Sequence, residues 1–479
     1  MRFYRFLAIS IVAPIILLSC GEAQDGRENT TIISSQPSNT TSNNHYVALT
    51  GSDVSGDGTF ERPWQTVHHA LKLMPRDKSR LTLNLREGAY PLATALLIDE
   101  QYSGSERGVF TIRSQDGENA VLDGSLIFRF GAMVSIRNAS YVTLENLELT
   151  NLVGNKTGIH VTGASENITI SNNKIHNMHW TTDASAASVP EPADNLNPVA
   201  IVGDSAEPIK QVTVTGNKVF NLTTGYSEAI KIVGNVDGFL ITKNEVYDVS
   251  NIGIVAAGNY AWVGLQEPHL NQARNGVIRD NEVYRCVSPV AASAGIYVDG
   301  ARDITVINNN SHHNTVGFSV GSEEPGVASN VALTNNVASD NIEAGVVIGT
   351  ISANSMVDHV TLSGNEIHGN YTSPAWGGGP IIINKSKNIS IEENKIHSIS
   401  QYMITVNAVS ENLKLNKNQY ESTAVSNDKA VFSWVGIDSR NYIGFENYKS
   451  TTGQDALSTF NSSDGSIFSS ILNSVKKRL

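Results

Sequence analysis

Residues 295–320 read GIYVDGARDITVINNNSHHNTVGFSV and contain one unit of a pattern that returns along most of the chain. Three short segments rich in β-branched residues, GIYV, DITV and the run to His312, are separated by turns rich in Gly, Asn and Asp. Aliphatic residues at alternate positions are typical of a β-strand, whereas an amphipathic helix needs apolar residues at 3.6-residue spacing. The stretch therefore predicts three strands joined by tight turns.

An asparagine marks the same bend in successive units. Most of these asparagines lie about 27 to 29 residues apart, an interval typical of repeat architectures. Inward aliphatic side chains are expected to stack from coil to coil, and the asparagine amides to form a ladder along the bend. The pattern predicts a β-solenoid of about ten coils with three strands per coil. The asparagines are Asn146, Asn173, Asn217, Asn244, Asn281, Asn309, Asn336, Asn365 and Asn394.

Segments at both ends of the repeats carry a family resemblance. HYVALTGSD at 45–53, PWQTV at 63–67 and LREGAY at 85–90 are similar to the start of secreted carbohydrate-active β-helices, and FENY at 445–448 resembles a closing segment. The chain resembles the right-handed parallel β-helix proteins of the pectate-lyase-like superfamily over residues 45–450. The resemblance implies an all-β, single right-handed parallel β-helix. Its known members include lyases, hydrolases, epimerases and adhesins, so the fold alone leaves the chemistry open.

A helix is predicted near the N-terminal end of the solenoid. Within Gln65 to Met74, the residues Thr66, Val67, Ala70, Leu71 and Met74 fall at helical spacing. A helix here can cover the open edge of the first coil and so cap the solenoid.

The first residues predict export and lipid attachment. A basic start and a short apolar run end in LLSCG, which reads as a lipobox with Cys20 as the lipidated residue. We expect a lipoprotein signal peptide at 1–19, a flexible Ser- and Thr-rich tether at 20–44, the β-helix at 45–450 and a tail at 451–479. By resemblance to bacterial lipoproteins, Gly21 favours the outer membrane, with the protein facing the periplasm or the cell surface.

Composition limits the partners. The 34 basic and 46 acidic residues give a net charge of −12, which argues against nucleic acid and leaves a polysaccharide as the expected partner of a monomer. Cys286 is the only cysteine besides Cys20, so the mature chain is expected to form no internal disulfide. No metal-binding motif stands out, and Ca²⁺ remains open as a cofactor.

Irregular repeat intervals indicate where function lies. Longer connections, such as 180–197 and 259–274, fall before or after the strands of the Gly-Ile-x-Val type. Loops of this kind form walls on both sides of one sheet, and variable loops on a rigid scaffold usually carry binding. The sequence therefore predicts a groove over this sheet.

Strand alternation gives the side chains that face this groove. One outward row is predicted as His160, Ile201, Lys231, Val255, Tyr297, Ser319, Val347 and Ile382, and a second as Thr162, Val233, Asp299, Gly321 and Asn384. Lys231 stands out on an apolar strand, and Tyr297 and Asp299 stand out in GIYVDG. His160, Glu228, Trp262, Arg274 and Glu323 are predicted to help bind substrate.

Two chemistries fit these residues, and a lyase on an acidic polysaccharide is placed slightly ahead. In β-elimination, Lys231 would be the base, Arg274 would neutralise the substrate carboxylate and Tyr297 would be the acid. In glycoside hydrolysis, Asp299 would pair with Glu323 or Glu228.

A third alternative is a glycan-binding or adhesin module without catalysis. The solenoid needs no active site to be stable. Such a module would bind through Tyr297, Trp262 and Trp376.

Overall fold

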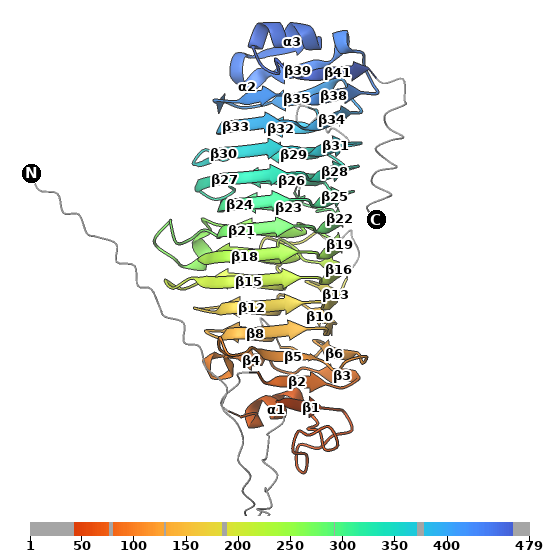
Figure 1. The fold of residues 1–479 in the computed structure, drawn as a ribbon, viewed down its shortest axis with the longest axis vertical. Helices are drawn as coiled ribbons and strands as arrows, with labels where there is room; N and C mark the ends of the chain where they lie inside the picture. The colour runs from red at the N-terminus through yellow and green to blue at the C-terminus, as the bar shows by residue number, and fades with distance from the viewer. Residues whose placement is uncertain are drawn as a thin grey trace, which may run out of the picture. The chain divides into compact units, whose positions relative to one another are not determined.

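Three long parallel sheets form the walls of a solenoid (Figure 1). The computed structural model describes residues 43–75, 80–128, 131–183, 189–291, 293–370 and 378–462, which belong to one compact unit that begins at Asn43. Successive strands along the chain enter the sheets in turn, and each strand pairs with the strand one coil away. The predicted single parallel β-helix is confirmed.

The sheets are named A, B and C. Sheet A contains β1 (Asn44–Val47), β2 (Thr82–Leu85), β5 (Phe110–Ser114), β8 (Ser140–Glu145), β12 (Glu166–Ser171), β15 (Ile209–Thr215), β18 (Val236–Thr242), β21 (Arg274–Arg279), β24 (Arg302–Ile307), β27 (Gly326–Thr334), β30 (Ser355–Ser363), β33 (Ser386–Glu392), β36 (Ser410–Glu411) and β37 (Lys414–Asn416). Sheet B contains β3 (Gly88–Pro91), β6 (Ala120–Asp123), β9 (Glu148–Thr150), β10 (Leu152–Val153), β13 (Lys174–His179), β16 (Lys218–Thr223), β19 (Glu245–Val249), β22 (Glu282–Cys286), β25 (Asn310–His312), β28 (Val337–Ser339), β31 (Glu366–His368), β34 (Lys395–Ser398), β38 (Gln419–Ser422) and β41 (Thr459–Ser462). Sheet C contains β4 (Leu96–Ile98), β7 (Ala132–Arg137), β11 (Thr157–Thr162), β14 (Asn197–Gly203), β17 (Ile230–Gly234), β20 (Ile254–Ala257), β23 (Ala294–Asp299), β26 (Val316–Gly321), β29 (Ala344–Ile348), β32 (Ile381–Ile383), β35 (Tyr402–Val406), β39 (Val431–Trp434) and β40 (Arg440–Ile443).

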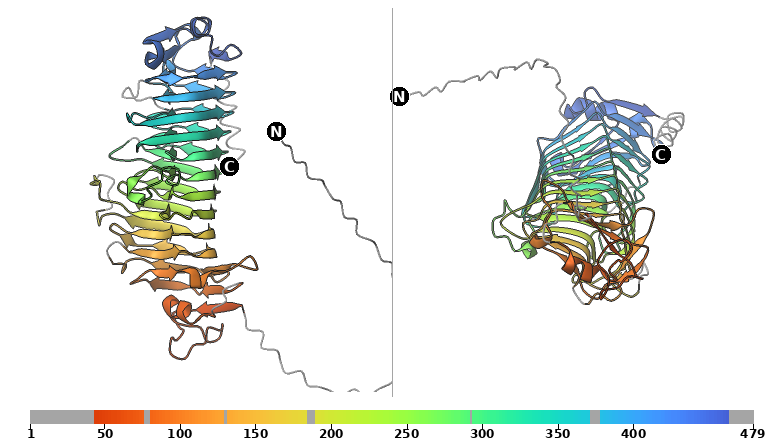
Figure 2. Two further views of the ribbon diagram at one scale, coloured as in Figure 1. Left: turned by 90° about the vertical axis from the view of Figure 1, so that its left-hand side faces the viewer. Right: turned by 60° about the horizontal axis from the view of Figure 1, so that its bottom comes forward.

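The stack is longer than the sequence predicted. In sheet C, 12 strands from β4 to β39 stack in parallel, and β40 only pairs antiparallel with β39, so the estimate of about ten coils was slightly low. The estimate counted asparagines of the repeat. The first coils precede this repeat and the last coils follow it, so they were not included in the count. The side view on the left of Figure 2 shows the strands of successive coils lying one above another.

Side chains that point inward form one continuous apolar core. In β23, Ile296 and Val298 are about 1% exposed, and they stack on Phe318 and Val320 of β26 in the next coil. Burial of this kind contributes about 25 cal/mol per Å² of apolar surface removed from water. The core thus holds each strand of sheet C in register, and this register fixes which residues face outward.

The asparagine ladder is confirmed, with one correction. Asn309 Nδ2 donates to Asn336 Oδ1 at 3.0 Å, and bonds of this type link each asparagine from Asn173 to Asn394 to the next. Asn146 is not part of the ladder: it is exposed with φ 54°, and Leu147 takes the ladder position. A second ladder, which the sequence analysis missed, links Asn341 to Asn370 at 2.7 Å and begins at Asn314.

The predicted helix near the N-terminal end is present. Helix α1 (Val67–Leu73) begins after Thr66, whose side chain accepts a hydrogen bond from the His69 N–H and so caps the helix. Val67, Ala70 and Leu71 are buried against the core. Among the described residues, the short 3₁₀ helices are η1 (Glu100–Tyr102), η2 (Ala261–Val263) and η4 (Asn427–Lys429).

The expectations for the N-terminal region lie outside the described residues. These are the signal peptide at 1–19, the lipidated Cys20 and most of the tether at 20–44. In the part of the chain that the structure describes, no helix has both the length and the hydropathy of a membrane span.

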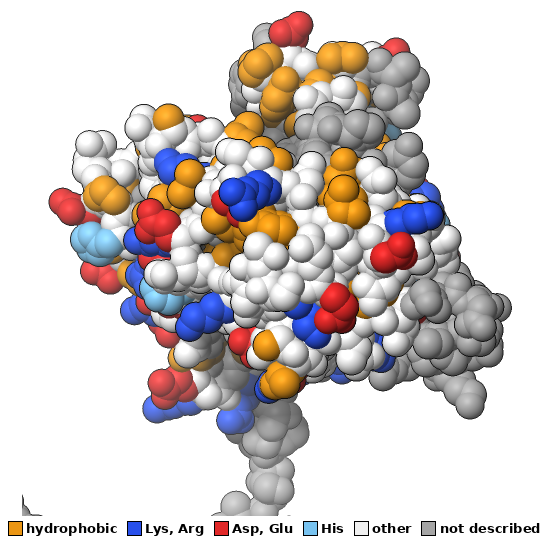
Figure 3. Space-filling view, turned by 90° about the horizontal axis from the view of Figure 1, so that it is seen from above, with side chains coloured by type: hydrophobic (Ala, Val, Ile, Leu, Met, Phe, Trp, Pro, Cys, Tyr) orange, Lys and Arg blue, Asp and Glu red, His pale blue; other side chains and the backbone are white. Residues whose placement is uncertain are grey.

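Helices α2 (Val435–Asp438) and α3 (Phe445–Thr452) close the other end. The Tyr448 ring stacks on Phe432 at 4.0 Å between centroids, and the buried Asp455 carboxylate accepts from Tyr448 Oη and Tyr420 Oη at 2.9 Å each. Strand β41 pairs with β38, so part of the region predicted as a tail belongs to the solenoid. Seen from above this end, hydrophobic side chains are exposed in small groups with charged and other polar side chains between them (Figure 3).

Candidate functional site

A groove of about 730 Å³ lies over the outer face of sheet C. Its floor is formed by strands from β11 to β23. Loop residues such as Asn195 and Ala291, which precede strands of the sheet, line one side, and Tyr260 and Glu323, from loops that follow strands, line the groove as well. The structure therefore places the predicted groove where the loop insertions indicated.

The floor consists of the predicted outward rows, with one correction. Lys231 is paired in register with Val255, and Val255 with Tyr297, so these three side chains follow one another along the groove. The residue beside Lys231 on β14 is Ala200, not Ile201, because Ile201 points into the core and is 0% exposed. The outward position of β14 that corresponds to Lys231 therefore comes one residue earlier in the sequence than predicted.

Two carboxyl groups meet at one end of the groove. Asp299 is paired in register with Gly321, and the chain turns after β26 to bring Glu323 back over Asp299. The Glu323 N–H donates to Asp299 Oδ1 at 2.8 Å. Tyr260 Oη lies 2.5 Å from Asp299 Oδ2 and 3.4 Å from Glu323 Oε2. Asp299, Glu323 and Tyr260 thus form one hydrogen-bonded cluster.

This cluster has unusual protonation behaviour. Burial, followed by the negative charge of Glu323, raises the pKa of Asp299 to about 7. Burial and the charge of Glu228 also raise the pKa of Glu323. A phenol has one proton and can donate to only one carboxylate at a time, so Tyr260 cannot satisfy both. Two neighbouring carboxyl groups in such a place tend to share one proton, with one acid and one carboxylate.

Two phenols surround the carboxyl pair. Burial is the largest cause that raises the pKa of both Tyr260 and Tyr297, and the charge of Asp299 comes second. The hydroxyls therefore stay protonated and act as donors. Tyr297 also packs against the apolar floor residues, among them Val255. The predicted role of Tyr297 as an acid in elimination is thus opposed by its environment, whereas a role in positioning is compatible with it.

Lys231 lies further along the groove in an ion pair. Its Nζ is 3.0 Å from Glu228 Oε2, and the two side chains are only 12% and 14% exposed. The same ammonium lies 5.7 Å from the centre of the Trp262 ring, which is 58% exposed. Lys231 Nζ also donates to Ser227 Oγ at 3.4 Å. An exposed indole beside a fixed ion pair offers a platform for a sugar ring with polar groups at its edge.

Polar side chains extend the site towards β11. Ser227 Oγ lies 3.0 Å from Asn195 Oδ1 and 2.9 Å from Asn197 Oδ1, and its single proton is donated to one of these oxygens at a time. His160 lines the same end, and burial lowers the pKa of its imidazole, which favours the neutral ring. Neutral amide, hydroxyl and imidazole groups of this kind are suited to hydrogen bonds with sugar hydroxyls.

Seven of the predicted site residues line this groove and one does not. The seven are His160, Glu228, Lys231, Trp262, Tyr297, Asp299 and Glu323. Arg274 lies in β21 of sheet A, where its Nη1 donates to Asn235 Oδ1 at 2.9 Å and its Nε is 3.2 Å from Asp237 Oδ2. It is 7% exposed and therefore cannot reach a substrate over sheet C. The chain leaves sheet C before residue 274. Arg274 is paired in register with Asp237 of β18, and this acidic partner in sheet A was the sequence signal for its true position.

Some residues of the site were not predicted from sequence. Tyr260 belongs to the loop after β20, and Asn195 and Asn197 belong to the end of another insertion. Strand alternation gives no position for loop residues, and only their place inside long insertions hinted at a role. Trp376, the third predicted aromatic contact, lies outside the described residues.

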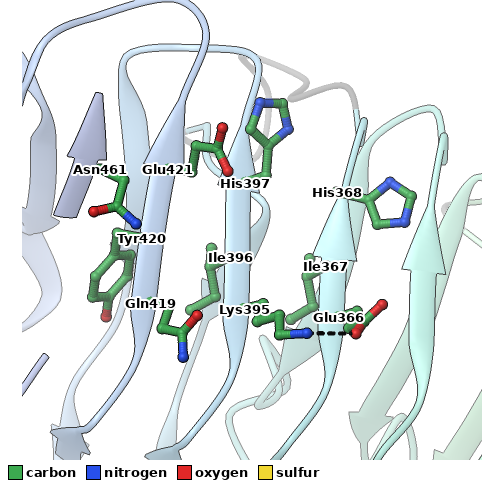
Figure 4. Close-up of a pocket in the computed structure, with 10 residues that line it drawn as sticks. All are labelled: Glu366, Ile367, His368, Lys395, Ile396, His397, Gln419, Tyr420, Glu421 and Asn461. Carbon is green, nitrogen blue, oxygen red and sulfur yellow. Dashed lines mark hydrogen bonds and ion pairs between the residues drawn. The ribbon is translucent and has the colours of Figure 1, made fainter. Parts of the chain in front are cut away.

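A second hollow of about 160 Å³ lies on sheet B near the C-terminal end. Figure 4 shows His368, His397 and Glu421 on consecutive strands, with Lys395 Nζ 2.9 Å from Glu366 Oε1. Burial lowers the pKa of both histidines. These side chains follow one another in a row rather than converging on one point. Among the described residues, no group of His, Cys, Asp or Glu is arranged to hold a metal ion, in this hollow or in the groove.

Comparisons with known proteins agree with the architecture. The model of the right handed beta helix region matches residues 269–470. The chain is 28% identical over 448 residues to the uncharacterized protein YwoF of Bacillus subtilis (strain 168), covering 87% of each chain.

Two solved structures of the GH136 lacto-N-biosidase from Eubacterium ramulus share the fold. The native structure has a TM-score of 0.53 at 11% identity and covers 88% of this chain and 68% of that chain. The selenomethionine derivative has a TM-score of 0.50 at 12% identity and covers 88% and 67%. The family model and these two structures therefore agree with the sheet topology on a right-handed parallel β-helix fold.

The raised pKa of Asp299 predicts a pH-dependent cost to stability. The unfolded chain ionises Asp299 near its ordinary value of 3.8, whereas the folded chain keeps the proton up to about pH 7. Unfolding therefore releases a proton in this interval, and the free energy of unfolding falls as pH rises from about 4 to 7. Asp299→Asn removes this dependence, so the variant should gain about 2 to 4 kcal/mol relative to wild type between pH 4 and pH 8.

Urea unfolding at several pH values measures this gain. The variant also changes one hydrogen bond, but this alters its free energy of unfolding by the same amount at every pH. The change of stability with pH therefore stays visible. Asp116→Asn, an exposed carboxyl with a side chain 73% exposed, is the control for the change in net charge. A difference between Asp299→Asn and wild type that stays constant with pH would contradict the assignment.

Proposed function

We propose that this protein is a glycoside hydrolase that acts on a neutral glycan bound along the groove of sheet C. The observation that carries the proposal is the meeting of Asp299 and Glu323 at one phenol, at the end of a groove with an apolar floor. Hydrolysis of a glycosidic bond needs one carboxylic acid and one carboxylate on opposite sides of the bond. An acid and a carboxylate that share one proton meet this need.

The roles follow from the environments of the two groups. Asp299 is the more buried and keeps its proton to about pH 7, so it is the general acid that protonates the leaving oxygen. Glu323 is the more exposed and supplies the negative charge. Because both groups contact Tyr260 Oη, their nearest oxygens lie within about 6 Å, which supports a retaining mechanism with Glu323 as nucleophile. Tyr260 and Tyr297 hold the pair in place.

The charge of the groove favours hydrolysis over the lyase chemistry placed first by the sequence. Elimination needs a base and a cation that neutralises the substrate carboxylate. Lys231 is the only Lys or Arg among the described lining residues, and it is already bound to Glu228. Glu228, Asp299, Glu323 and Glu324 line the same groove and would repel a uronic-acid polymer.

A screen of polysaccharides tests the proposal. Neutral substrates are β-1,3-glucan, β-1,4-mannan, arabinoxylan and β-1,4-galactan; acidic substrates are polygalacturonate and alginate. Each reaction is followed by the release of reducing ends and by the ultraviolet absorbance of an unsaturated product. We expect reducing ends from a neutral glycan without that absorbance. Absorbance from an acidic substrate would support a lyase, and binding without cleavage would support a binding module.

Lys231→Ala separates the two reactions further. The hydrolase needs Lys231 only for substrate binding, so this variant should keep kcat within about tenfold and raise KM. A lyase that uses Lys231 as its base would lose about 10²–10⁴-fold in rate.

Glu228→Gln should move the pH dependence of hydrolysis. The negative charge of Glu228 contributes to the raised pKa values of Asp299 and Glu323, so its removal lowers both. Wild type should lose kcat/KM as pH rises through about 7, where Asp299 loses its proton. Both limbs of the profile should lie at lower pH in Glu228→Gln. An unchanged profile would show that other groups control the rate.

Attachment to a membrane through lipid on Cys20 belongs to the proposal as well. It rests on the LLSCG motif and the short apolar run before it. Detergent phase separation of wild type and Cys20→Ala tests it, since only the lipidated form enters the detergent phase.

A further inference from the structure

The three members of the hydrogen-bonded cluster come from turns in consecutive coils. Tyr260 follows β20, Asp299 ends β23 and Glu323 follows β26. The backbone joins the first two turns, because the Gly258 N–H donates to the Asp299 carbonyl at 2.8 Å. The distances within the cluster therefore depend on how the three turns are held against one another.

Gln272 connects the turn of Asp299 with the chain that follows Glu323. Its Nε2 donates to the Gly300 carbonyl at 2.7 Å and to the Val327 carbonyl at 2.8 Å, and the residue is only 9% exposed. Gly300 directly follows Asp299. Val327 lies in β27, the strand that the chain enters after Glu323. Both N–H bonds of the amide are used, so one nitrogen holds together the two segments that carry the carboxyl groups.

Asn259 crosses the same turns from the other end of the loop that carries Tyr260. Its Nδ2 donates to the Gly300 carbonyl at 3.3 Å and to Ser322 Oγ at 3.4 Å. A Cβ added at Gly300 would lie 2.7 Å from this nitrogen, and one at Gly326 would lie 2.4 Å from it. Both glycines also have a positive φ, of 69° and 155°, which other residues rarely adopt. The Asn259 amide thus occupies a space that these two glycines leave open.

We infer that Gln272 and Asn259 are positioning residues, whose side-chain amides set the distance between the two carboxyl groups of the proposed hydrolase. We call these two amides the bracket. They stand at the two ends of the loop that carries Tyr260, because Gly258 and Gln272 form a β-bridge at its base. Neither is among the described residues that line the groove, so the bracket acts through the turns and not on the substrate. The inference rests on the proposed function.

The distance between the carboxyl groups matters for the reaction and for their protonation. Misplacement of a reacting group by about 1 Å can cost about 10²-fold in rate. Burial raises the pKa of Asp299 most, and the charge of Glu323 follows. Glu228 raises this pKa further, while the hydrogen bond from Tyr260 lowers it, and Tyr297 also faces the pair. A wider, wetter arrangement would bring the pKa of Asp299 closer to its ordinary value.

Gln272→Met tests the bracket through kinetics. Methionine keeps the length of the side chain but donates no hydrogen bond, so the two carbonyls are no longer held together. On the glycan that wild type cleaves, kcat should fall about 10²-fold while KM stays within about threefold, because the residues that line the groove are unchanged. The alkaline limb of the pH profile should move to lower pH.

Asn259→Ala is a second variant of the bracket. Its bonds of 3.3 and 3.4 Å are longer than those of Gln272, so kcat should fall less, by about tenfold. If Gln272→Met does not fold, Asn259→Ala takes its place in both measurements, with smaller changes in the same direction.

Asn365→Ala is the matched control. Its Nδ2 also donates to two carbonyls, those of Leu333 at 2.9 Å and Ser363 at 3.1 Å, but it belongs to the asparagine ladder between sheets A and B. This variant should lose stability and keep the kcat and the pH profile of wild type.

Urea unfolding at several pH values gives a second measurement that needs no glycan. In wild type the free energy of unfolding falls as pH rises from about 4 to 7, because folded Asp299 keeps a proton that the unfolded chain has lost. In Gln272→Met the pKa of folded Asp299 lies closer to 3.8, so the fall is smaller and ends at lower pH. Asn365→Ala should be less stable by the same amount at every pH.

The outcomes separate this inference from the proposed function. A wild-type kcat in Gln272→Met, with a loss of stability that is the same at every pH, would show that the bracket only holds the fold and overturn the inference. Equal losses of kcat in Gln272→Met and Asn365→Ala would overturn it too, because general destabilisation would explain both. A smaller dependence of stability on pH in Gln272→Met, without hydrolysis of any glycan by wild type, would remove the hydrolase and leave the bracket in place.

Discussion

Asp299→Asn and Glu323→Gln should each lower the kcat of glycan hydrolysis by about 10²–10⁴-fold while KM changes little. Asp299→Asn removes the proton donor for the leaving oxygen, and Glu323→Gln removes the nucleophile. Both amides keep the volume of the side chain, so the groove stays intact. The measurement is steady-state kinetics on the neutral glycan that wild type cleaves, with circular dichroism to show that both variants are folded.

The combined variant and a neighbouring acid complete this test. Asp299→Asn with Glu323→Gln should be little worse than either single change, because the two groups act as a unit. Glu324→Gln changes another carboxyl that lines the groove but lies outside the hydrogen bonds of Tyr260, and it should keep most of kcat. Equal losses in Glu324→Gln and Asp299→Asn would mean that the groove needs charge in general and not this pair.

Asn309→Ala should reduce the free energy of unfolding by about 3 to 5 kcal/mol, because it interrupts the asparagine ladder. Asn309 Oδ1 accepts from Asn281 Nδ2 at 2.9 Å, and Asn309 Nδ2 donates to Asn336 Oδ1 at 3.0 Å and to the Ile278 carbonyl at 2.9 Å. All of these bonds are buried, so the groups left behind have no water to replace the lost partner. Urea unfolding monitored by circular dichroism measures the change.

Asn146→Gly is the matched control for the ladder. Asn146 occurs in the same sequence pattern but is exposed, with φ 54°, a conformation that glycine adopts readily. Its replacement should change stability by less than about 1 kcal/mol. Similar losses in the two variants would show that the asparagines act only as turn residues.

The fold was predictable because its signal is local and repeated. In each coil, a residue such as Ile296 lies above its counterpart one coil away, so the same alternation returns at each strand of sheet C. The coil number was not predictable from the asparagines. In the first coils, strands such as β2 and β5 stack before the ladder begins at Leu147 and Asn173.

The site was predictable only as far as strand register extends. The outward positions of Tyr297 and Asp299 can be derived from the alternation within β23. Glu323 could be placed near them because it lies two residues after Gly321, the register partner of Asp299. Tyr260 does not follow, because it reaches the carboxyl pair from a loop whose path is set by tertiary contacts. Arg274 was predicted to bind substrate because it ends an insertion near the groove, but the structure places it in β21 of sheet A.

The lack of information about neighbouring strands also explains why the sequence analysis placed a lyase ahead of a hydrolase. A lysine on an apolar strand suggests a base when only its own strand is considered. Its counterion, Glu228, was visible three residues away, but the closeness of the pair and the crowding of other carboxylates depend on the fold. Charge across neighbouring coils is therefore the reason why we propose hydrolysis rather than elimination.

Cleavage in oxygen-18-labelled water tests the central proposal most directly. Hydrolysis by Asp299 and Glu323 transfers one oxygen from water to the new anomeric carbon, so each product with a new reducing end should carry one heavy oxygen in wild type. Asp299→Asn and Glu323→Gln should give almost no labelled product in the same time. A cleaved product with an unsaturated sugar and no heavy oxygen would show elimination and contradict the proposed hydrolase.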